Sequence, residues 1–402
     1  MSEVILDISR LISRVRYSTP SGVDRVEMAY ARGLLGRYGD ALAFAAVHPS
    51  GLYGRLPRSA VLAYLDELER RWSCENDSPR QRSLVSVIPW LGALLPSRAG
   101  RGRGGGVYVQ ASPHHLTRAA LVRRILAREQ ARFLCLVHDL IPIEYPEYAR
   151  PAGARQHRER IATIAELADG VIVNSAATGQ SLRPWLERSG RAVDVRVALL
   201  GTEPLAAAEP FRPADGRPYF VCIGTIEPRK NHLLLLNLWR HLAQTLPAER
   251  VPRLVIVGRR GWENEQVLDM LERSPALPGH VEELNGCSDA RMASLLRGAR
   301  ALLMPSFAEG YGMPVAEALS VGTPVLCSDL PALREAGGGA PDYLDPLDGP
   351  GWQAKILDHA ERGPAHSAQM KRLKAWRAPT WDRHIAIVGE AITALTASRT
   401  TA

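Results

Sequence analysis

The sequence predicts an α/β protein of two domains, each built on a parallel β-sheet. The chain has 402 residues, which is too long for one ordinary core and fits two domains of about 150–200 residues each. Short apolar runs alternate with amphipathic stretches along it, a pattern typical of parallel strands that helices cover on both faces. No apolar run reaches the roughly 18 residues of a membrane span, so we expect a soluble protein.

The expected strands form two groups separated by a linker. The first group is 4–9, 107–112, 133–139, 170–175 and 195–201, and the second is 219–224, 253–258, 301–306 and 323–329. Residues 201–218 between them are rich in proline, alanine and charge and lack any period. We therefore expect domains over 1–205 and 206–380, followed by a final helix over 381–402. Ligands of such sheets bind at the carboxyl ends of strands, so two facing domains would share one site.

Composition narrows the classes of function. A formal charge of +8 fits nucleic acid, anionic lipid or an acidic substrate such as a nucleotide. Aromatic residues are only 6% and do not cluster with Arg and Lys, so we expect no nucleic-acid partner. The five cysteines follow neither a zinc nor a redox pattern, which indicates reduced thiols. The N-terminal segment lacks the basic start and apolar block of a secretion signal, so we expect a cytoplasmic protein.

One apolar segment allows two interpretations. Residues 84–96, LVSVIPWLGALLP, are followed by Arg98, Arg101 and Arg103. The segment is too short to span a bilayer, but it could lie in the interface with the arginines on lipid phosphates, which would place the protein peripherally on the inner face of the cell membrane. The alternative is a buried helix followed by a solvated loop.

Residues 307–330, FAEGYGMPVAEALSVGTPVLCSDL, hold two glutamates around a glycine-rich turn. The turn follows a predicted strand, and Pro314 suits the first turn of the next helix. A helix N-terminus at this place attracts anions, so a phosphate is the expected guest. Glu309 and Glu317 would accept hydrogen bonds from hydroxyls instead. A molecule that offers both phosphates and hydroxyls is a nucleotide sugar.

Arg229 and Lys230 repeat this arrangement with cations. They follow the strand at 219–224, where a helix is predicted to start, and an Arg fork beside a Lys point charge neutralises a diphosphate well. Cations at a helix N-terminus oppose its dipole, so some compensating anion is expected. The alternative is an ordinary solvated helix start.

Four blocks of the second half resemble glycosyltransferase family 4, whose members have the two-domain GT-B fold. The blocks are GTIEPRKN, LVIVGRRGW, LNGCSDARMASLLRGARALLMPSFAEGYGMPVAEALSVGTPVLCSD and PTWDRHI. The resemblance covers most of residues 219–395, with weaker matches in the first half. It implies two facing Rossmann-like domains with a deep interdomain cleft, and a last helix that crosses back onto the first domain.

The resemblance assigns roles to residues of the second half. Glu309 would hold hydroxyls of the transferred sugar, Glu317 would hold the ribose, and Arg229 with Lys230 matches the diphosphate clamp. Further donor-binding positions implied by the resemblance are Gly224, Gly286, Cys287, Gly310, Tyr311 and Gly312. For the segment around Gly286 and Cys287, contact with the base competes with an ordinary turn and a helix cap at Ser288 or Asp289.

The first half would supply the other wall of the cleft. In YSTPSGVDRVEMAYARGLL, turn residues precede an amphipathic helix, and Gly22 permits close approach of the donor. Asp24 and Arg25 would orient substrate or bind acceptor, or else form surface or interdomain contacts. His138 and Asp139 end the strand at 133–139. The resemblance implies that His138 contacts the donor sugar, and we give Asp139 an orienting role.

The expected reaction is hexosyl transfer to a saccharide or lipid-linked saccharide acceptor in bacterial polysaccharide synthesis. By resemblance the transfer retains anomeric configuration, a leaving-phosphate oxygen takes the acceptor proton, and the protein stabilises charge on the diphosphate. GDP-mannose is the first expected donor and a UDP- or dTDP-sugar the second. The chain has no Asp-x-Asp motif, so neither metal nor cofactor is expected. The alternatives are an inverting transferase with Asp139 or His138 as base, a non-catalytic sugar-binding scaffold, and a basic membrane- or nucleic-acid-binding protein without catalysis.

Overall fold

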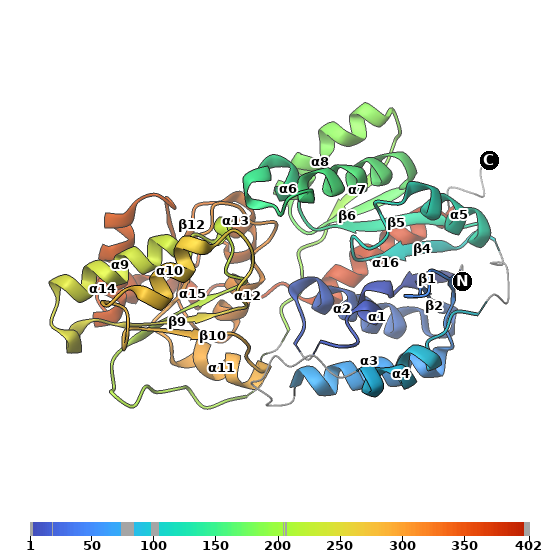
Figure 1. Ribbon diagram of the computed structural model, residues 1–402. Coiled ribbons are helices and arrows are strands. Elements are labelled where there is room, and N and C mark those ends of the chain that lie inside the picture. The colour runs from blue at the N-terminus through green and yellow to red at the C-terminus, as the bar shows by residue number, and fades with distance from the viewer. Residues whose placement is uncertain are drawn as a thin grey trace.

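The computed structural model describes residues 3–17, 19–73, 84–97, 104–203, 205 and 207–397. It has two lobes, each a β-sheet with helices packed against it (Figure 1). The first lobe carries the blue to green elements, and the second carries the yellow to orange ones. The predicted α/β class with two sheets is confirmed.

The first sheet has the strand order β3-β2-β1-β4-β5-β6-β7. Its strands are Val4–Asp7 (β1), Leu42–Val47 (β2), Tyr53–Arg55 (β3), Val107–Gln110 (β4), Arg132–Val137 (β5), Gly170–Val173 (β6) and Asp194–Val197 (β7). The runs expected as strands form β1 and β4 to β7, whereas β2 and β3 were not predicted. The expectation of fully buried strands fails at β7, which lies at the sheet edge and is largely exposed.

The expectation that every strand runs parallel is wrong for β3. This strand pairs with β2 in the antiparallel direction, whereas the other pairs of the first sheet are parallel. Only residues 48–52 connect β2 to β3. Such a short connection makes a hairpin, since a parallel crossover needs a dozen or more residues.

The second sheet has the order β10-β9-β8-β11-β12-β13, and its pairs are parallel. Its strands are Tyr219–Ile223 (β8), Arg253–Val257 (β9), Val281–Leu284 (β10), Leu302–Met304 (β11), Val325–Ser328 (β12) and Asp342–Leu344 (β13). The sequence predicted β8, β9, β11 and β12. The two edge strands β10 and β13 were missed because VEEL and DYL carry charges that interrupt the apolar pattern.

Helices cover both sheets. Those of the first lobe are Ser9–Ser13 (α1), Gly22–Tyr38 (α2), Arg58–Ser73 (α3), Leu84–Ala93 (α4), Ala119–Glu129 (α5), Ile141–Glu144 (α6), Gly153–Leu167 (α7) and Ala176–Ser189 (α8). Those of the second are His232–Thr245 (α9), Glu265–Arg273 (α10), Asp289–Gly298 (α11), Met313–Ser320 (α12), Pro331–Gly337 (α13), Gly349–Glu361 (α14) and Pro364–Leu373 (α15).

The last helix, Trp381–Ala397 (α16), lies in the first lobe although the second lobe precedes it in sequence (Figure 1). It packs against α2 and the strands β4 to β7. The ring of His384 lies between the Leu199 carbonyl and the Tyr30 hydroxyl, at 3.0 and 2.9 Å. The chain therefore passes between the lobes twice, and Thr202 donates to the Pro379 carbonyl where the two passages meet.

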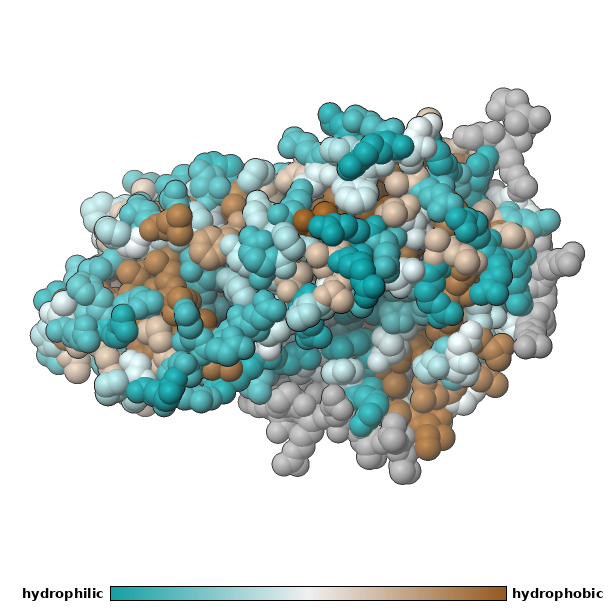
Figure 2. Space-filling model, turned by 45° about the horizontal axis from the view of Figure 1, so that its top comes forward, coloured by the Kyte–Doolittle hydropathy of each residue, from teal (hydrophilic) through white to brown (hydrophobic). Residues whose placement is uncertain are grey.

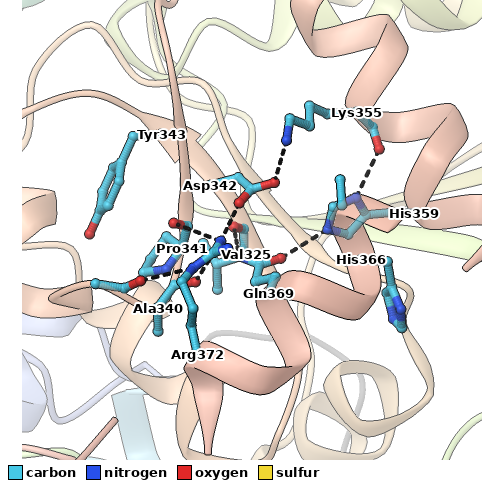
Figure 3. A network of polar contacts seen from close by, with 12 residues as sticks. Val325, Ala340, Pro341, Asp342, Tyr343, Lys355, His359, His366, Gln369 and Arg372 are labelled. Atoms are coloured by element: carbon cyan, nitrogen blue, oxygen red, sulfur yellow. Dashed lines mark hydrogen bonds and ion pairs between the residues drawn. The ribbon is translucent and has the colours of Figure 1, made fainter. Parts of the chain in front are cut away.

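A buried polar network fastens α14 and α15 to the second sheet (Figure 3). His359 lies 2.9 Å from both the Lys355 carbonyl and Gln369 Oε1, and Gln369 Nε2 donates to the Val325 carbonyl. Asp342 of β13 joins the network through Lys355, whose Nζ lies 2.8 Å from Oδ2. These contacts hold the outer helices of the second lobe in a fixed position.

The apolar segment 84–96 forms the helix α4 and the residues after it. Val87 and Leu94 are buried, while Ile88 and Leu95 are exposed by 60% and 54%. Figure 2 shows hydrophobic side chains gathered at the lower right of the molecule, the side on which α4 lies in Figure 1. The arginines expected beside it lie outside the described residues. Among the residues described, no helix is long and apolar enough to cross a bilayer.

Glu27 of α2 makes stability depend on pH. Burial and the neighbouring Asp7 raise the pKa of Glu27 to about 8, from an ordinary 4.5. The folded protein therefore holds this proton more tightly than the unfolded chain. The resulting stability is fully present below pH 4.5 and is lost as the pH rises through 8.

We expect Glu27→Gln to be roughly 1–3 kcal/mol more stable than the wild type at pH 9 and no more stable at pH 5. The glutamine mimics the protonated acid, so it removes the cost of ionising a buried carboxyl. Urea denaturation at the two pH values measures the difference, with the exposed Glu187→Gln as control. The same gain at both pH values would show that Glu27 is ionised in the folded protein.

Candidate active site

Some of the candidate residues from both halves of the chain line one cavity between the lobes, here called the cleft pocket. Its volume is about 310 Å³. The residues that line it include Gly22, Arg25, Glu203, Gly224, Gly286, Cys287, Asp289, Met313 and Glu317. Figure 1 shows α2 and α12 facing each other at this boundary. The structure thus brings together candidate residues that lie up to 295 positions apart, from Gly22 to Glu317.

Glycines let the backbone form the wall of the cleft pocket. Gly22 opens α2, and a Cβ there would lie 3.6 Å from Met313 Sδ. Gly224 follows β8 and has a φ of 147°, which L side chains rarely adopt. A Cβ at Gly224 would lie 3.1 Å from Lys230 Cε. Both positions place backbone next to the cavity.

Arg229, Lys230 and Glu309 form one ion-pair cluster next to this wall. Lys230 Nζ lies 2.6 Å from Glu309 Oε1, and Arg229 Nη1 lies 2.8 Å from Oε2. Arg229 Nε also lies 2.6 Å from Glu227 Oε1. Burial raises the pKa of Glu309, but Arg229 and Lys230 outweigh burial and lower the pKa to about 2. Glu309 is therefore ionised at neutral pH.

The compensating anion expected for these cations is partly supplied by the protein. Glu309 and Glu227 place two carboxylates against Arg229 and Lys230. The alternative of a solvated helix start is wrong, since Lys230 is buried. The short helix Pro228–Lys230 ends with Asn231 in the left-handed region, and this turn directs both cations inward before α9 begins.

Glu317 lies in an acidic part of the cleft pocket. Arg25 Nη2 lies 2.5 Å from Asp289 Oδ1 and Nη1 lies 3.1 Å from Oδ2, a two-pronged contact from α2 to α11. Burial raises the pKa of Glu317, Arg25 lowers it, and Asp289 and Glu203 raise it further. Arg25 therefore makes the interdomain contact that the sequence left open, while also lining the pocket.

The glycine-rich loop after β11 is seated on the first lobe. Ser175 Oγ and Thr178 Oγ1 donate to the Gly310 carbonyl at 2.8 and 3.3 Å. A Cβ at Gly310 would lie 2.4 Å from the His138 carbonyl oxygen and 2.9 Å from Asp139 Cβ. Only glycine fits at this contact. Ser175 also caps α8, its Oγ accepting from Thr178 N at 3.0 Å.

Tyr311 and Gly312 continue the loop in different ways. The Tyr311 hydroxyl donates to the Leu200 carbonyl at 3.0 Å, and the ring packs into the first core. Its side chain thus joins the lobes, and only its backbone belongs to the loop. Gly312 has a φ of 102° and precedes α12, where a Cβ would lie 2.4 Å from Leu333 Cδ2.

His138 and Asp139 lie beside this loop at the end of β5. His138 Nε2 lies 2.8 Å from the Ala111 carbonyl, so this nitrogen donates and Nδ1 is left as an acceptor. Burial lowers the pKa of His138, and the hydrogen bond to Ala111 only partly opposes this shift. The lowered pKa keeps the ring neutral. Asp139 Oδ1 accepts from Ile141 N at 3.1 Å, which orders the start of α6.

Asp24 does not reach the cleft pocket. It is buried at the start of α2, with Arg10 Nε at 2.7 Å and Arg14 Nε at 3.2 Å. Its carboxylate also accepts from Ser21 N and closes a capping box. Neighbouring helix residues point about 100° apart, so Arg25 faces the other lobe while Asp24 faces its own. The prediction of an acceptor or orienting role for Asp24 therefore finds no support in the geometry.

The segment after β10 forms the helix cap that the sequence allowed, and it also borders the cleft pocket. Gly286 and Cys287 line the cleft pocket. Ser288 caps α11, its Oγ accepting from Arg291 N at 3.2 Å. The cap fixes the turn, and the turn leaves the preceding backbone at the cavity.

Sequence reasoning missed two carboxylates of the site. Glu227 lies within the TIEPRKN segment, and its spacing of two residues from Arg229 was a signal that could have found it. Glu203 comes from the linker and carries no pattern of its own. Burial raises the pKa of Glu203 while Arg25 lowers it.

Comparison with known proteins relates part of the chain to glycosyltransferases. Residues 207–337 match the family model described as "Glycosyl transferases group 1". The chain is 29% identical over 230 residues to the serotype-specific mannosyltransferase WbdA of Escherichia coli, covering 52% of this chain and 27% of that protein. It is 39% identical over 141 residues to the O-antigen chain mannosyltransferase B of Escherichia coli, covering 35% and 36%. The chain thus spans about a quarter to a third of the length of these relatives.

The fold of nearly the whole chain is similar to that of a solved structure. Sucrose-phosphate synthase from Thermosynechococcus elongatus superposes with a TM-score of 0.63 at 16% identity, covering 99% of this chain and 100% of that one. The two facing domains, of which the first has one antiparallel edge strand, have the predicted GT-B fold. The family match falls on the lobe that carries Arg229, Lys230 and Glu309. Residues 207–337, about a third of the chain, are therefore similar to the group 1 glycosyl transferases.

Proposed function

We propose that the protein transfers mannose from GDP-mannose to a saccharide or lipid-linked saccharide acceptor, with retention of configuration. The observation that carries the proposal is the cluster of Arg229, Lys230 and Glu309 beside a glycine-walled cavity. The mannosyltransferases named above favour mannose as the sugar. UDP- and dTDP-sugars are the alternative donors.

The donor would occupy the cleft pocket along its length. Glu317 would accept from the ribose hydroxyls, and the base would lie against the backbone of Gly286 and Cys287. The diphosphate would meet the N-terminus of α12, Arg229 and Lys230, where it competes with Glu309 for the cations. Glu309, released from part of this pairing, would accept from hydroxyls of the sugar.

Catalysis would then be mainly electrostatic. Charge grows on the diphosphate as the glycosidic bond breaks, and Arg229 with Lys230 stabilises it more in the transition state than in the ground state. In the retaining reaction a leaving-phosphate oxygen takes the acceptor proton. The competing inverting reaction would use His138 Nδ1 or the Asp139 carboxylate as base. The configuration of the product distinguishes the two.

Activity is expected to persist in EDTA. Two cations are already held at the site, so they can replace the metal that bridges a diphosphate in other transferases. The rate of GDP release in excess EDTA should equal the rate in Mg²⁺. Loss of activity in EDTA that returns with Mg²⁺ or Mn²⁺ would contradict metal independence.

The proposed acceptor also predicts where in the cell the protein acts. A lipid-linked acceptor would bring the protein to the inner face of the cell membrane, where the exposed Ile88 and Leu95 of the α4 region would contact lipid. Sedimentation with anionic vesicles at low salt tests this contact.

The function is tested with purified protein and a donor panel of GDP-mannose, GDP-fucose, UDP-glucose, UDP-GlcNAc and dTDP-rhamnose. Nucleotide release with a mannoside acceptor identifies the donor, and NMR of the product gives the anomeric configuration. Release from GDP-mannose alone supports the proposal. Release from none of them would favour a non-catalytic sugar-binding scaffold.

A further inference from the structure

A second cavity, here called the arginine pocket, adjoins the ion-pair cluster through Arg229. Its volume is about 480 Å³, within the usual size of small-molecule sites. Its lining includes Asp139, Tyr148, Arg150, Arg160, Arg229 and Trp262. No lining residue is common to the arginine pocket and the cleft pocket as the structure describes them. Lys230 lies against Gly224 of the cleft pocket, so the cluster connects the two cavities.

Two arginines of this cavity have no carboxylate partner among the described residues. Arg160 forms no ion pair there, and its Nε is buried without a hydrogen-bond partner. Burial, together with Arg10, lowers the pKa of Arg160, against Asp139 and Glu159, which raise it. Arg150 lies over the Trp262 ring, 4.6 Å from its centre. Arg229, in contrast, is held by Glu227 and Glu309. Among the described residues the cavity therefore holds two arginines outside any ion pair, and Asp139 and Glu159 offset only part of the charge of Arg160.

Aromatic rings form another part of the same cavity. Tyr148 stacks on Phe307, with ring centres 5.9 Å apart and an angle of 12°. Trp262 Nε1 donates to the Tyr148 carbonyl at 2.9 Å and so joins the two lobes. Flat rings beside Gln156 and Asp139 offer a sugar both an apolar face and hydrogen-bonding groups.

We propose that the arginine pocket binds the acceptor and that the acceptor is a saccharide carrying an anionic group, held by Arg160 and Arg150. This rests on the proposed function, because a transferase needs its acceptor next to the donor's transferred sugar. The position fits, since Arg229 belongs to both the pocket and the cluster. The anion has two possible sources, the diphosphate of a lipid-linked saccharide and the carboxylate of a uronic acid.

The test measures transfer from GDP-mannose to two anionic acceptors and to one neutral acceptor. Farnesyl diphosphate-linked N-acetylglucosamine and p-nitrophenyl β-D-glucuronide carry the two anions, and p-nitrophenyl β-D-glucoside is neutral. We expect the ratio of kcat/KM for one anionic acceptor to kcat/KM for the neutral acceptor to be at least ~10. The anionic acceptor with the higher kcat/KM identifies the source of the anion. Arg160→Gln should reduce the ratio to about one. Arg158→Gln, an exposed arginine of the same helix, should keep it.

Three results would overturn the proposal. They are equal use of neutral and anionic acceptors by the wild type, an unchanged ratio in Arg160→Gln, and a loss of GDP affinity in that variant, which would assign Arg160 to the donor. If the wild type releases no nucleotide at all, the proposed function fails instead. Binding of the same three acceptors, measured by calorimetry without donor, then decides the arginine pocket separately, and no preference for an anion refutes it.

Discussion

Lys230→Ala is expected to lower the turnover of GDP-mannose by ~10²–10³-fold while weakening donor binding by no more than ~10-fold. Lys230 Nζ lies 2.6 Å from Glu309 and behind the wall of the cleft pocket. Its charge would stabilise the transition state more than the ground state, because the diphosphate becomes more negative as the glycosidic bond breaks. Steady-state kinetics gives kcat, and calorimetry with GDP-mannose gives the dissociation constant.

The control is Lys355→Ala, which removes another lysine–carboxylate pair of the second lobe. Lys355 Nζ lies 2.8 Å from Asp342, in the network that fastens the outer helices (Figure 3). This variant should keep its turnover. If Lys230→Ala instead weakens binding as strongly as it slows turnover, Lys230 contributes uniform binding and not catalysis.

Gly310→Ala is expected to lower kcat/KM by at least ~10-fold, because the added methyl group has no space. It would lie 2.4 Å from the His138 carbonyl oxygen, so loop and first lobe must separate. Such displacement of a site by about 1 Å costs up to ~10²-fold in rate. The hydrogen bonds of Ser175 and Thr178 to Gly310 would be lost with it.

Gly339→Ala is the matched control, since a Cβ there meets nothing within 4 Å. It should retain the activity and the melting temperature of the wild type. Full activity of Gly310→Ala would show that the loop need not touch the first lobe during the reaction.

The sequence predicts the buried strands because parallel strands covered on both faces are apolar throughout. Val4, Ile5 and Leu6 of β1 have this pattern and are fully buried, as are Phe220 and Val221 of β8. Edge strands lack it, as the glutamates of β10 illustrate. The direction of β3 depends on the length of a connection rather than on the composition of the strand.

The site is predictable only as far as its residues lie close in sequence. The spacing of Glu309 and Glu317 and the pair Arg229 and Lys230 could be found in short motifs. The contact between Lys230 and Glu309 joins residues 79 positions apart and follows from the order of strands in the second sheet. Arg160 carried no signal, since an unpaired arginine is recognised only when its surroundings are known.

Calorimetric titration of GDP-mannose into the wild-type protein and Glu317→Gln, both in EDTA, tests the central claim most directly. The claim is that the cleft pocket binds a nucleoside diphosphate sugar without metal. We expect binding of the wild type with a dissociation constant of ~1–100 μM and a loss of at least ~10-fold in the variant, where the ribose hydroxyls lose a charged acceptor. Absence of binding, or equal binding by Glu317→Gln, would contradict this assignment of the pocket.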